Sequence, residues 1–243
     1  MKKDIRIPKK ITPDPILESV VELRFKTNLP SDAIFGMLYN KLNEMFPGSY
    51  ESLPILQVPE AVRLQDKNLE FSPHHKFKNE NFQVNIGPKV IAIISLKPYS
   101  GWKAYFSIIE LIIKYVIQQN FIQEVSRIGI RYIDFFEEIN IFDHLEFKMD
   151  GFPFPSKQSS YTTAFQYEKF MTNLQVSNSN QILIKNKVCR GSIFDTDTYV
   201  ETNIPVNESD ILDIISNGHT IEKKIFYSLI KDSFIQTLNP EYD

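Results

Sequence analysis

The stretch from Ile16 to Phe25, Ile-Leu-Glu-Ser-Val-Val-Glu-Leu-Arg-Phe, decides the fold class of this chain. Every second residue from Leu17 onward is apolar or small, and the residues between them include two glutamates and an arginine. A period of two residues is typical of a β-strand that buries one face and exposes the other. We therefore predict a strand here, with one face in a hydrophobic core.

The rest of the chain alternates between strand and helix patterns. Ser31 is predicted to cap a helix that ends at Pro47-Gly48, and a second apolar helix is predicted from Gly101 to about Gln119. Residues 50–68 are interrupted by prolines, which favours a loop or a short edge strand. Further strands are predicted at residues 69–77, 81–96, 125–136, 163–176, 181–187 and 189–202.

Turn and helix signals complete the pattern. Gly87-Pro88 predicts a turn inside residues 81–96, and Asn178-Ser179-Asn180 predicts a turn between two later strands. Asn207 or Ser209 is predicted to cap a short helix. After Asn217-Gly218, a longer helix is predicted from Thr220 to Leu238.

These patterns predict an α+β fold, with mostly antiparallel sheet and amphipathic helices packed on it. Nineteen Phe, eleven Tyr and only eight Gly also favour sheet. The order of elements suggests two related halves. We expect an extended basic arm over residues 1–15, an N-terminal α+β half over 16–139, and a C-terminal β-meander with helices over 140–243, packed as one unit with the first half.

Charge and cysteine content limit the class of partner. Lys and Arg number 27 against 30 Asp and Glu, a net charge of −3, so nucleic-acid binding is possible but not favoured by bulk charge. The single cysteine, Cys189, fits a reducing compartment, and we expect a soluble, cytoplasmic protein. The longest apolar run, residues 108–117, is much shorter than the roughly 20 residues that span a bilayer, so no membrane segment is expected.

Charged side chains on predicted strands are the first candidates for a site. Asp195 and Asp197 would share one face of a strand about 7 Å apart, close enough to share a divalent cation. With Glu22 or Glu18 as a further ligand, they suggest a metal-dependent phosphodiesterase or nuclease that uses Mg²⁺ or Mn²⁺. The alternative is that these acids pair with arginines across the sheet.

Arg127 and Arg131 would also share a strand face, with Gly129 between them. Two guanidinium groups suit a phosphate or carboxylate, so both residues, with Arg24, are candidates for an anion or nucleotide sensor. The alternative is that Gly129 makes room for a ring such as that of Trp102, while the arginines pair with acids.

The common catalytic motifs are absent from the sequence. No G-x-S-x-G, P-loop, dinucleotide-binding or H-E-x-x-H pattern occurs. His74-His75 is predicted to lie in a solvated loop, and Cys189 is predicted to be a buried or half-buried thiol. We therefore expect no cofactor and favour a protein that is not an enzyme.

Several segments together resemble a known family. Residues 15–18 and 21–25, the helix of Trp102, the strand 127–134 and the Asp195/Asp197 strand before a Phe-containing terminal helix are similar to a sporadically distributed family of bacterial proteins with no established activity. That family usually has Leu in place of Ile130 and Asn in place of Asp134. Its patchy distribution implies genes that move with defence, toxin or mobile-element cassettes.

The first function hypothesis is therefore a non-enzymatic protein-interaction component of a bacterial operon, of the defence or toxin–antitoxin kind. Its partner would be the product of a neighbouring gene or another copy of the chain. Exposed sheet edges and an aromatic surface would form the interface, with Trp102 and Tyr132 as candidate contacts.

Overall fold

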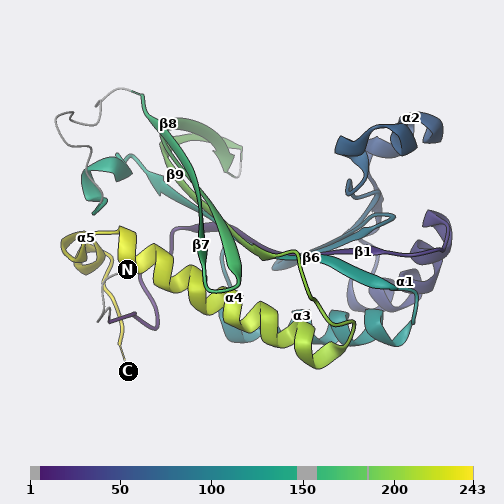
Figure 1. The fold of residues 1–243 in the computed structure, drawn as a ribbon. Helices are drawn as coiled ribbons and strands as arrows, with labels where there is room; N and C mark the ends of the chain where they lie inside the picture. Colours follow the sequence, from purple (N-terminus) through teal and green to yellow (C-terminus); the bar gives the residue numbers. More distant parts are fainter. Residues whose placement is uncertain (1–5, 147–157, 185, 243) are drawn as a thin grey trace. The chain divides into compact units, whose positions relative to one another are not determined.

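The computed structural model describes residues 6–146, 158–184 and 186–242, apart from the side chain of Leu64 (Figure 1). Within these residues nine antiparallel strands form one sheet, in the order β2-β3-β4-β5-β1-β6-β9-β8-β7. Five α-helices accompany it, so the predicted α+β fold with an antiparallel sheet is confirmed. The strands are β1 (Ile16–Lys26), β2 (Glu51–Ser52), β3 (His75–Lys78), β4 (Phe82–Ile86), β5 (Val90–Leu96), β6 (Glu124–Glu137), β7 (Ser160–Tyr167), β8 (Phe170–Ile184) and β9 (Lys187–Val200).

The helices are α1 (Ser31–Met45), α2 (Glu60–Gln65), α3 (Trp102–Gln118), α4 (Glu208–Leu229) and α5 (Asp232–Thr237). Three short 3₁₀ helices lie at Pro54–Gln57, Lys67–Leu69 and Ile141–His144. No helix of the described residues is long and apolar enough to cross a membrane.

The chain divides into two compact units, each built from separate segments. The terminal unit contains Met1–Glu18, Arg131–Thr198 and Asn217–Asp243, and the central unit contains Ser19–Ile130 and Tyr199–Ser216. The arm and halves expected from the sequence stay a prediction, and the first five residues of the arm lie outside the described residues.

The core of the central unit follows from the alternation in β1. Val21, Leu23 and Phe25 are each at most 1% exposed, whereas Glu22 and Arg24 on the other face are only half-buried. Tyr105 of α3 is fully buried, and its hydroxyl lies between the carbonyl oxygens of Ser19 (3.1 Å) and Ile93 (2.7 Å). Each fully buried ring contributes roughly 1.5–3 kcal/mol to folding, so this face holds α3 on the sheet.

The terminal unit has its own core. The β7–β8 hairpin pairs from Ser160↔Ser177 to Tyr167↔Phe170. Buried residues from β6, β8, β9, α4 and α5 form one apolar cluster beside it, including Phe136, Leu174, Phe194, Ile230 and Phe234. This cluster packs α4 and α5 against the sheet. β7 is the outermost strand of the sheet on this side.

Two predicted chain breaks are wrong. Asn178-Ser179-Asn180 does not form a turn, because β8 continues through it to Ile184, and Ser179 adopts a φ of 58° inside the strand. Asn217-Gly218 does not end a helix either, since α4 runs unbroken through it. The apolar stripe of α4 continues on both sides of the buried Gly218, and its burial offsets the roughly 1 kcal/mol that glycine costs a helix.

The real helix end lies further along the chain. Ile230 forms a β-bridge with Leu145, and the backbone N–H of Lys231 donates to His144 O (2.8 Å). Because the backbone N–H of Lys231 pairs with His144, it does not continue the hydrogen bonds of α4. The predicted helix 220–238 is therefore split into the end of α4 and a separate α5.

The first half also differs in detail from its prediction. Ser31 does not cap α1, because Pro30 occupies the N-cap position and no side-chain cap bond forms. The loop predicted over residues 50–68 contains the short edge strand β2 together with α2 and two 3₁₀ helices. The strand predicted at 69–77 is restricted to β3, and the turn at Gly87-Pro88 between β4 and β5 is confirmed.

Candidate functional site

The terminal unit holds an ionic cluster of Glu18, Arg131 and Asp195. Arg131 donates from Nε to Asp195 Oδ1 (2.8 Å) and from Nη2 to Oδ2 (2.5 Å). This bidentate geometry is the strongest that an arginine and a carboxylate form. Burial raises the pKa of Glu18, with Arg131 opposing and Asp195 adding to the shift. The pKa of Arg131 is raised, mainly by its hydrogen bond to Asp195 and further by the charges of the nearby carboxylates.

The central unit holds a second ionic cluster around Arg127. Arg127 is only 7% exposed, and its Nη1 donates to Glu22 Oε1 (2.7 Å). Arg24 Nε donates to the same oxygen (2.7 Å). Glu201 lies 3.8 Å from Arg127 Nε, and the guanidinium also lies 4.5 Å from the ring centre of Tyr199. The guanidinium is therefore occupied by side chains of its own unit.

Gly129 explains how Arg127 is accommodated. A Cβ at Gly129 would collide with the guanidinium of Arg127, so the missing side chain leaves room for that group. The prediction that Gly129 receives the ring of Trp102 is therefore wrong. Trp102 is half-buried and packs against Tyr105 and Phe106 within the same unit.

The acidic residues proposed as metal ligands are placed separately. Asp195 is bound by Arg131, and Glu22 by Arg24 and Arg127. Asp197 lies close enough to Arg131 for its charge to raise the pKa of that arginine. Among the described residues, no group of three or more His, Cys, Asp or Glu side chains could hold a metal ion. The pairing of acids with arginines, which the sequence offered as the alternative, accounts for these contacts.

The histidine pair does not lie in a solvated loop. His74 is 4% exposed and lies 3.1 Å from Arg63 Nη1, while His75 begins β3 and stacks on Phe35 with ring centres 3.7 Å apart. Burial, with a smaller contribution from the charge of Arg63, lowers the pKa of His74 to about 4. Burial also lowers the pKa of His75, so both rings are packing elements. Cys189 is buried.

A buried polar group under α4 was missed by the sequence analysis. Glu222 is 3% exposed, and neither carboxyl oxygen has a well-formed hydrogen bond within the described residues. Burial raises the pKa of Glu222 to about 8, and Thr196 and Thr198 lie near enough to oppose the shift only in part. Thr198 instead shares a hydroxyl–hydroxyl bond with Thr172 (2.8 Å). The sequence contains a sign of this position, because Glu222 lies three residues before Ile225 and four before Phe226, on the apolar stripe of α4.

Tyr132, a predicted interface residue, lies inside the terminal unit. It is 7% exposed, and its hydroxyl lies 2.8 Å from His219 Nδ1. Burial lowers the pKa of His219 to about 3, and the charge of Lys223 adds a smaller effect. Tyr132 is therefore buried within the terminal unit, and its role at an interface stays a prediction.

The outer strands of the terminal unit form an uncharged sheet edge. β7 (Ser-Tyr-Thr-Thr-Ala-Phe-Gln-Tyr) and β8 (Phe-Met-Thr-Asn-Leu-Gln-Val-Ser-Asn-Ser-Asn-Gln-Ile-Leu-Ile) contain no charged residue and no proline. β7 is the last strand of the sheet, and its strand neighbour is β8 (Figure 1). Its side chains alternate between exposed and half-buried. Edge strands usually carry lysines, prolines or bulges that prevent pairing, and β7 has neither of the first two.

The tip of the β8–β9 hairpin adds exposed apolar side chains to this edge. Leu183 is 68% exposed and Val188 is 59% exposed, the highest values among the large hydrophobic residues described. Ile182 and Ile184 beside them are half-buried. On its β7 side, β8 has no strand partner beyond the bond from Asn178 N to Ser159 O (3.1 Å) in the described residues. The β7 edge and the hairpin tip thus combine an unpaired strand with exposed apolar side chains, two features that can contact another protein.

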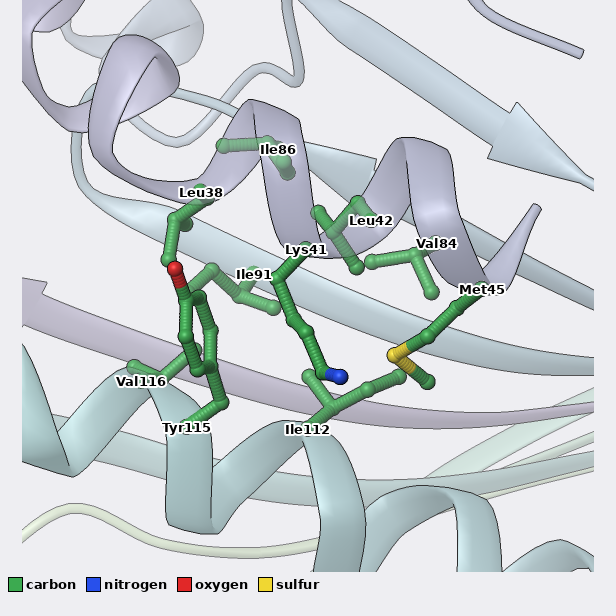
Figure 2. A pocket seen from close by; sticks show the side chains of 10 residues that line it. All are labelled: Leu38, Lys41, Leu42, Met45, Val84, Ile86, Ile91, Ile112, Tyr115 and Val116. Atoms are coloured by element: carbon green, nitrogen blue, oxygen red, sulfur yellow. The ribbon is translucent and has the colours of Figure 1, made fainter. Parts of the chain in front are cut away.

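The apolar hollow between α1 and α3 in the central unit is a packing gap. Its walls come from α1, α3, β4 and β5, and Figure 2 shows Lys41 and Tyr115 among otherwise aliphatic side chains. Tyr115 donates its hydroxyl to Met37 O (3.1 Å). A free volume of about 10 Å³ is near the smallest that holds one water. This hollow therefore has no room for a ligand.

No protein-family model matches the chain, and no curated protein matches it.

Proposed function

We propose that this chain is a non-enzymatic protein-binding component of a bacterial operon, of the defence or toxin–antitoxin kind. It binds by taking an extended segment of a partner protein as an additional strand beside β7. The uncharged edge of β7 carries this proposal, because its outward N–H and C=O groups form a template that only another extended chain can match.

The side chains of β7 indicate what kind of segment fits. Ser160, Thr162, Ala164 and Gln166 are exposed and small or polar, so they do not block an approaching strand. Tyr161 and Phe165 on the other face are half-buried against the apolar core of the terminal unit. Aromatic and β-branched residues pair well across strands, so the partner segment should be rich in them and poor in charge.

The ionic clusters support a binder better than an enzyme or an anion sensor. Arg24, Arg127 and Arg131 each bond to a carboxylate of their own unit, which leaves no guanidinium pair poised for a phosphate. The same bonds occupy Asp195 and Glu22. These ion pairs stabilise a polar face of the sheet, and they leave the edge of β7 as the place for a binding partner.

The test uses the full chain co-expressed with the products of its neighbouring genes. Thr162 and Ala164 lie opposite Gln175 and Asn173, which are exposed residues of the adjacent interior strand. The double variant Thr162→Lys/Ala164→Lys puts two charges on the edge, and Gln175→Lys/Asn173→Lys puts the same charges one strand inward.

We expect the native chain and the inner variant to co-purify a neighbouring gene product, and the edge variant to lose it while remaining folded. Equal retention by both double variants would exclude β7 as the binding edge. A native chain that stays monomeric and retains no neighbouring product would overturn the proposed function, and a native chain that dimerises through β7 would identify its partner as a second copy.

A further inference from the structure

An open, polar hollow lies in the terminal unit, where the end of β6 meets β8 and β9. Its volume is about 350 Å³, at the lower end of the roughly 300–1,000 Å³ range of small-molecule pockets. The side chains used below are Glu138, Asn140, Asn178, Ser179, Gln181 and Arg190. Ile139 and Gly191 complete the lining.

The floor of this hollow is held rigidly. Asn178 donates from Nδ2 to Asn140 Oδ1 (2.9 Å), and Asn178 Oδ1 accepts a bond from Ser159 N (2.7 Å). The backbone N–H of Glu138 donates to Arg190 O (2.9 Å). Asn178 is buried, and its two bonds are partly shielded from water. A preformed polar floor lowers the entropy that a ligand loses on binding.

Two wall residues have unusual backbones. In the described chain, seven non-glycine residues have positive φ, and four of them are asparagines, which tolerate that conformation. The other three are Glu138 (56°), Glu168 (54°) and Ser179 (58°). Glu168 lies in the β7–β8 turn, whereas Glu138 and Ser179 both line the hollow. Such conformations are strained and concentrate at ligand sites.

The charges of the hollow have opposite signs and no partner in the described chain. Arg190 and Glu138 are both exposed, and neither side chain makes an ion pair or hydrogen bond with a described residue. A phosphate would bind Arg190 but would meet the carboxylate of Glu138 in the same hollow. A ligand with one carboxylate and one ammonium group satisfies both residues.

We propose that this hollow binds a free α-amino acid. Its carboxylate pairs with the guanidinium of Arg190, and its ammonium group pairs with the carboxylate of Glu138. Gln181, which is exposed at the hollow, offers an amide to the ligand's side chain. This site uses none of the residues of the β7 edge and is independent of the proposed protein partner.

The experiment titrates each of the twenty common α-amino acids, inorganic phosphate and acetate into the native chain by calorimetry. The Arg190→Gln and Glu138→Gln variants remove one charge each. Lys187→Gln is the matched control, because Lys187 lies on the same strand, pairs with Glu137 (3.6 Å) and does not line the hollow.

We expect saturable binding of at least one amino acid, weakened about tenfold or more in both hollow variants and unchanged in Lys187→Gln. The methyl ester and the N-acetyl derivative of that amino acid should each bind as weakly as the variants. The proposal is overturned if no amino acid binds, if acetate or phosphate binds as tightly as the amino acid, or if both hollow variants bind like the native chain.

Discussion

Arg131 on β6 donates hydrogen bonds to both carboxylate oxygens of Asp195 on β9, from Nε to Oδ1 (2.8 Å) and from Nη2 to Oδ2 (2.5 Å). Asp195 has only 12% of its side chain exposed, although Arg131 keeps 47%. This bidentate ion pair joins the neighbouring strands β6 and β9, so it is a structural contact.

Asp195→Asn should lower the free energy of unfolding by about 1–2 kcal/mol, because it removes a charge-assisted bond that is partly screened by solvent. Urea unfolding of the full chain measures this. Glu137→Gln is the comparison, since its pair with Lys187 is long (3.6 Å) and exposed and should contribute almost nothing. Equal losses in the two variants would contradict the structural role of Arg131 and Asp195.

Glu22→Gln should destabilise the chain more, by about 2–3 kcal/mol, because the guanidinium of Arg127 is almost fully buried and would lose its nearest charge. The double variant Glu22→Gln/Arg127→Met should recover part of that loss, since it removes the buried charge as well. A thermodynamic cycle of Glu22→Gln, Arg127→Met and the double variant measures the coupling. Strictly additive effects would show that Glu22 does not stabilise Arg127.

Millimolar Mg²⁺ or Mn²⁺ should leave the melting temperature unchanged, because Asp195 and Glu22 are already bonded to arginines. Thermal unfolding with and without each metal is sufficient, with EDTA as the reference condition. A clear rise with either ion, lost in Asp197→Ala, would restore the metal-dependent phosphodiesterase hypothesis.

Glu222 should make stability depend on pH. Its folded-state pKa, raised to about 8, lies above the ordinary value of 4.5, so the folded chain holds a proton that the unfolded chain releases. Stability is therefore full below pH 4.5 and falls as the pH rises towards 8. His219, with its pKa lowered to about 3 from 6.5, acts in the opposite direction below pH 6.5.

The clean window for Glu222 is thus about pH 7.5 to 8, where His219 and the other histidines with lowered pKa are almost entirely neutral in both states. The free energy of unfolding should fall there by up to about 1.4 kcal/mol per pH unit. Glu222→Gln should flatten this slope, and Glu208→Gln, at the exposed first turn of α4, should keep it. A native chain with no slope between about pH 7.5 and 8 would show that Glu222 is ionised when folded.

Much of the fold was predictable from local patterns. The alternation of Val21, Leu23 and Phe25 identified the core face of β1, because a period of two needs no tertiary information. Asn217-Gly218 misled the prediction, since the apolar stripe of α4 outweighs a local break signal. Ser179 misled it similarly, because its left-handed backbone is absorbed inside β8.

The candidate site was less predictable. Charges on alternate strand positions suggested that acids and arginines meet, but partners such as Arg131 and Asp195 depend on the register between strands. The uncharged composition of β7 is plain in the sequence. Its significance appears only when the sheet order places β7 at an edge, which no local pattern reveals.

Hydrogen–deuterium exchange of the chain with and without its co-purified partner tests most directly whether a strand is added beside β7. Backbone amides of Ser160–Tyr167 that exchange quickly in the free chain should become protected on binding, while those of the opposite edge strand β2 stay unchanged. Protection confined to other elements, with β7 exchanging as fast in the complex as in the free chain, would contradict the proposed mode of binding.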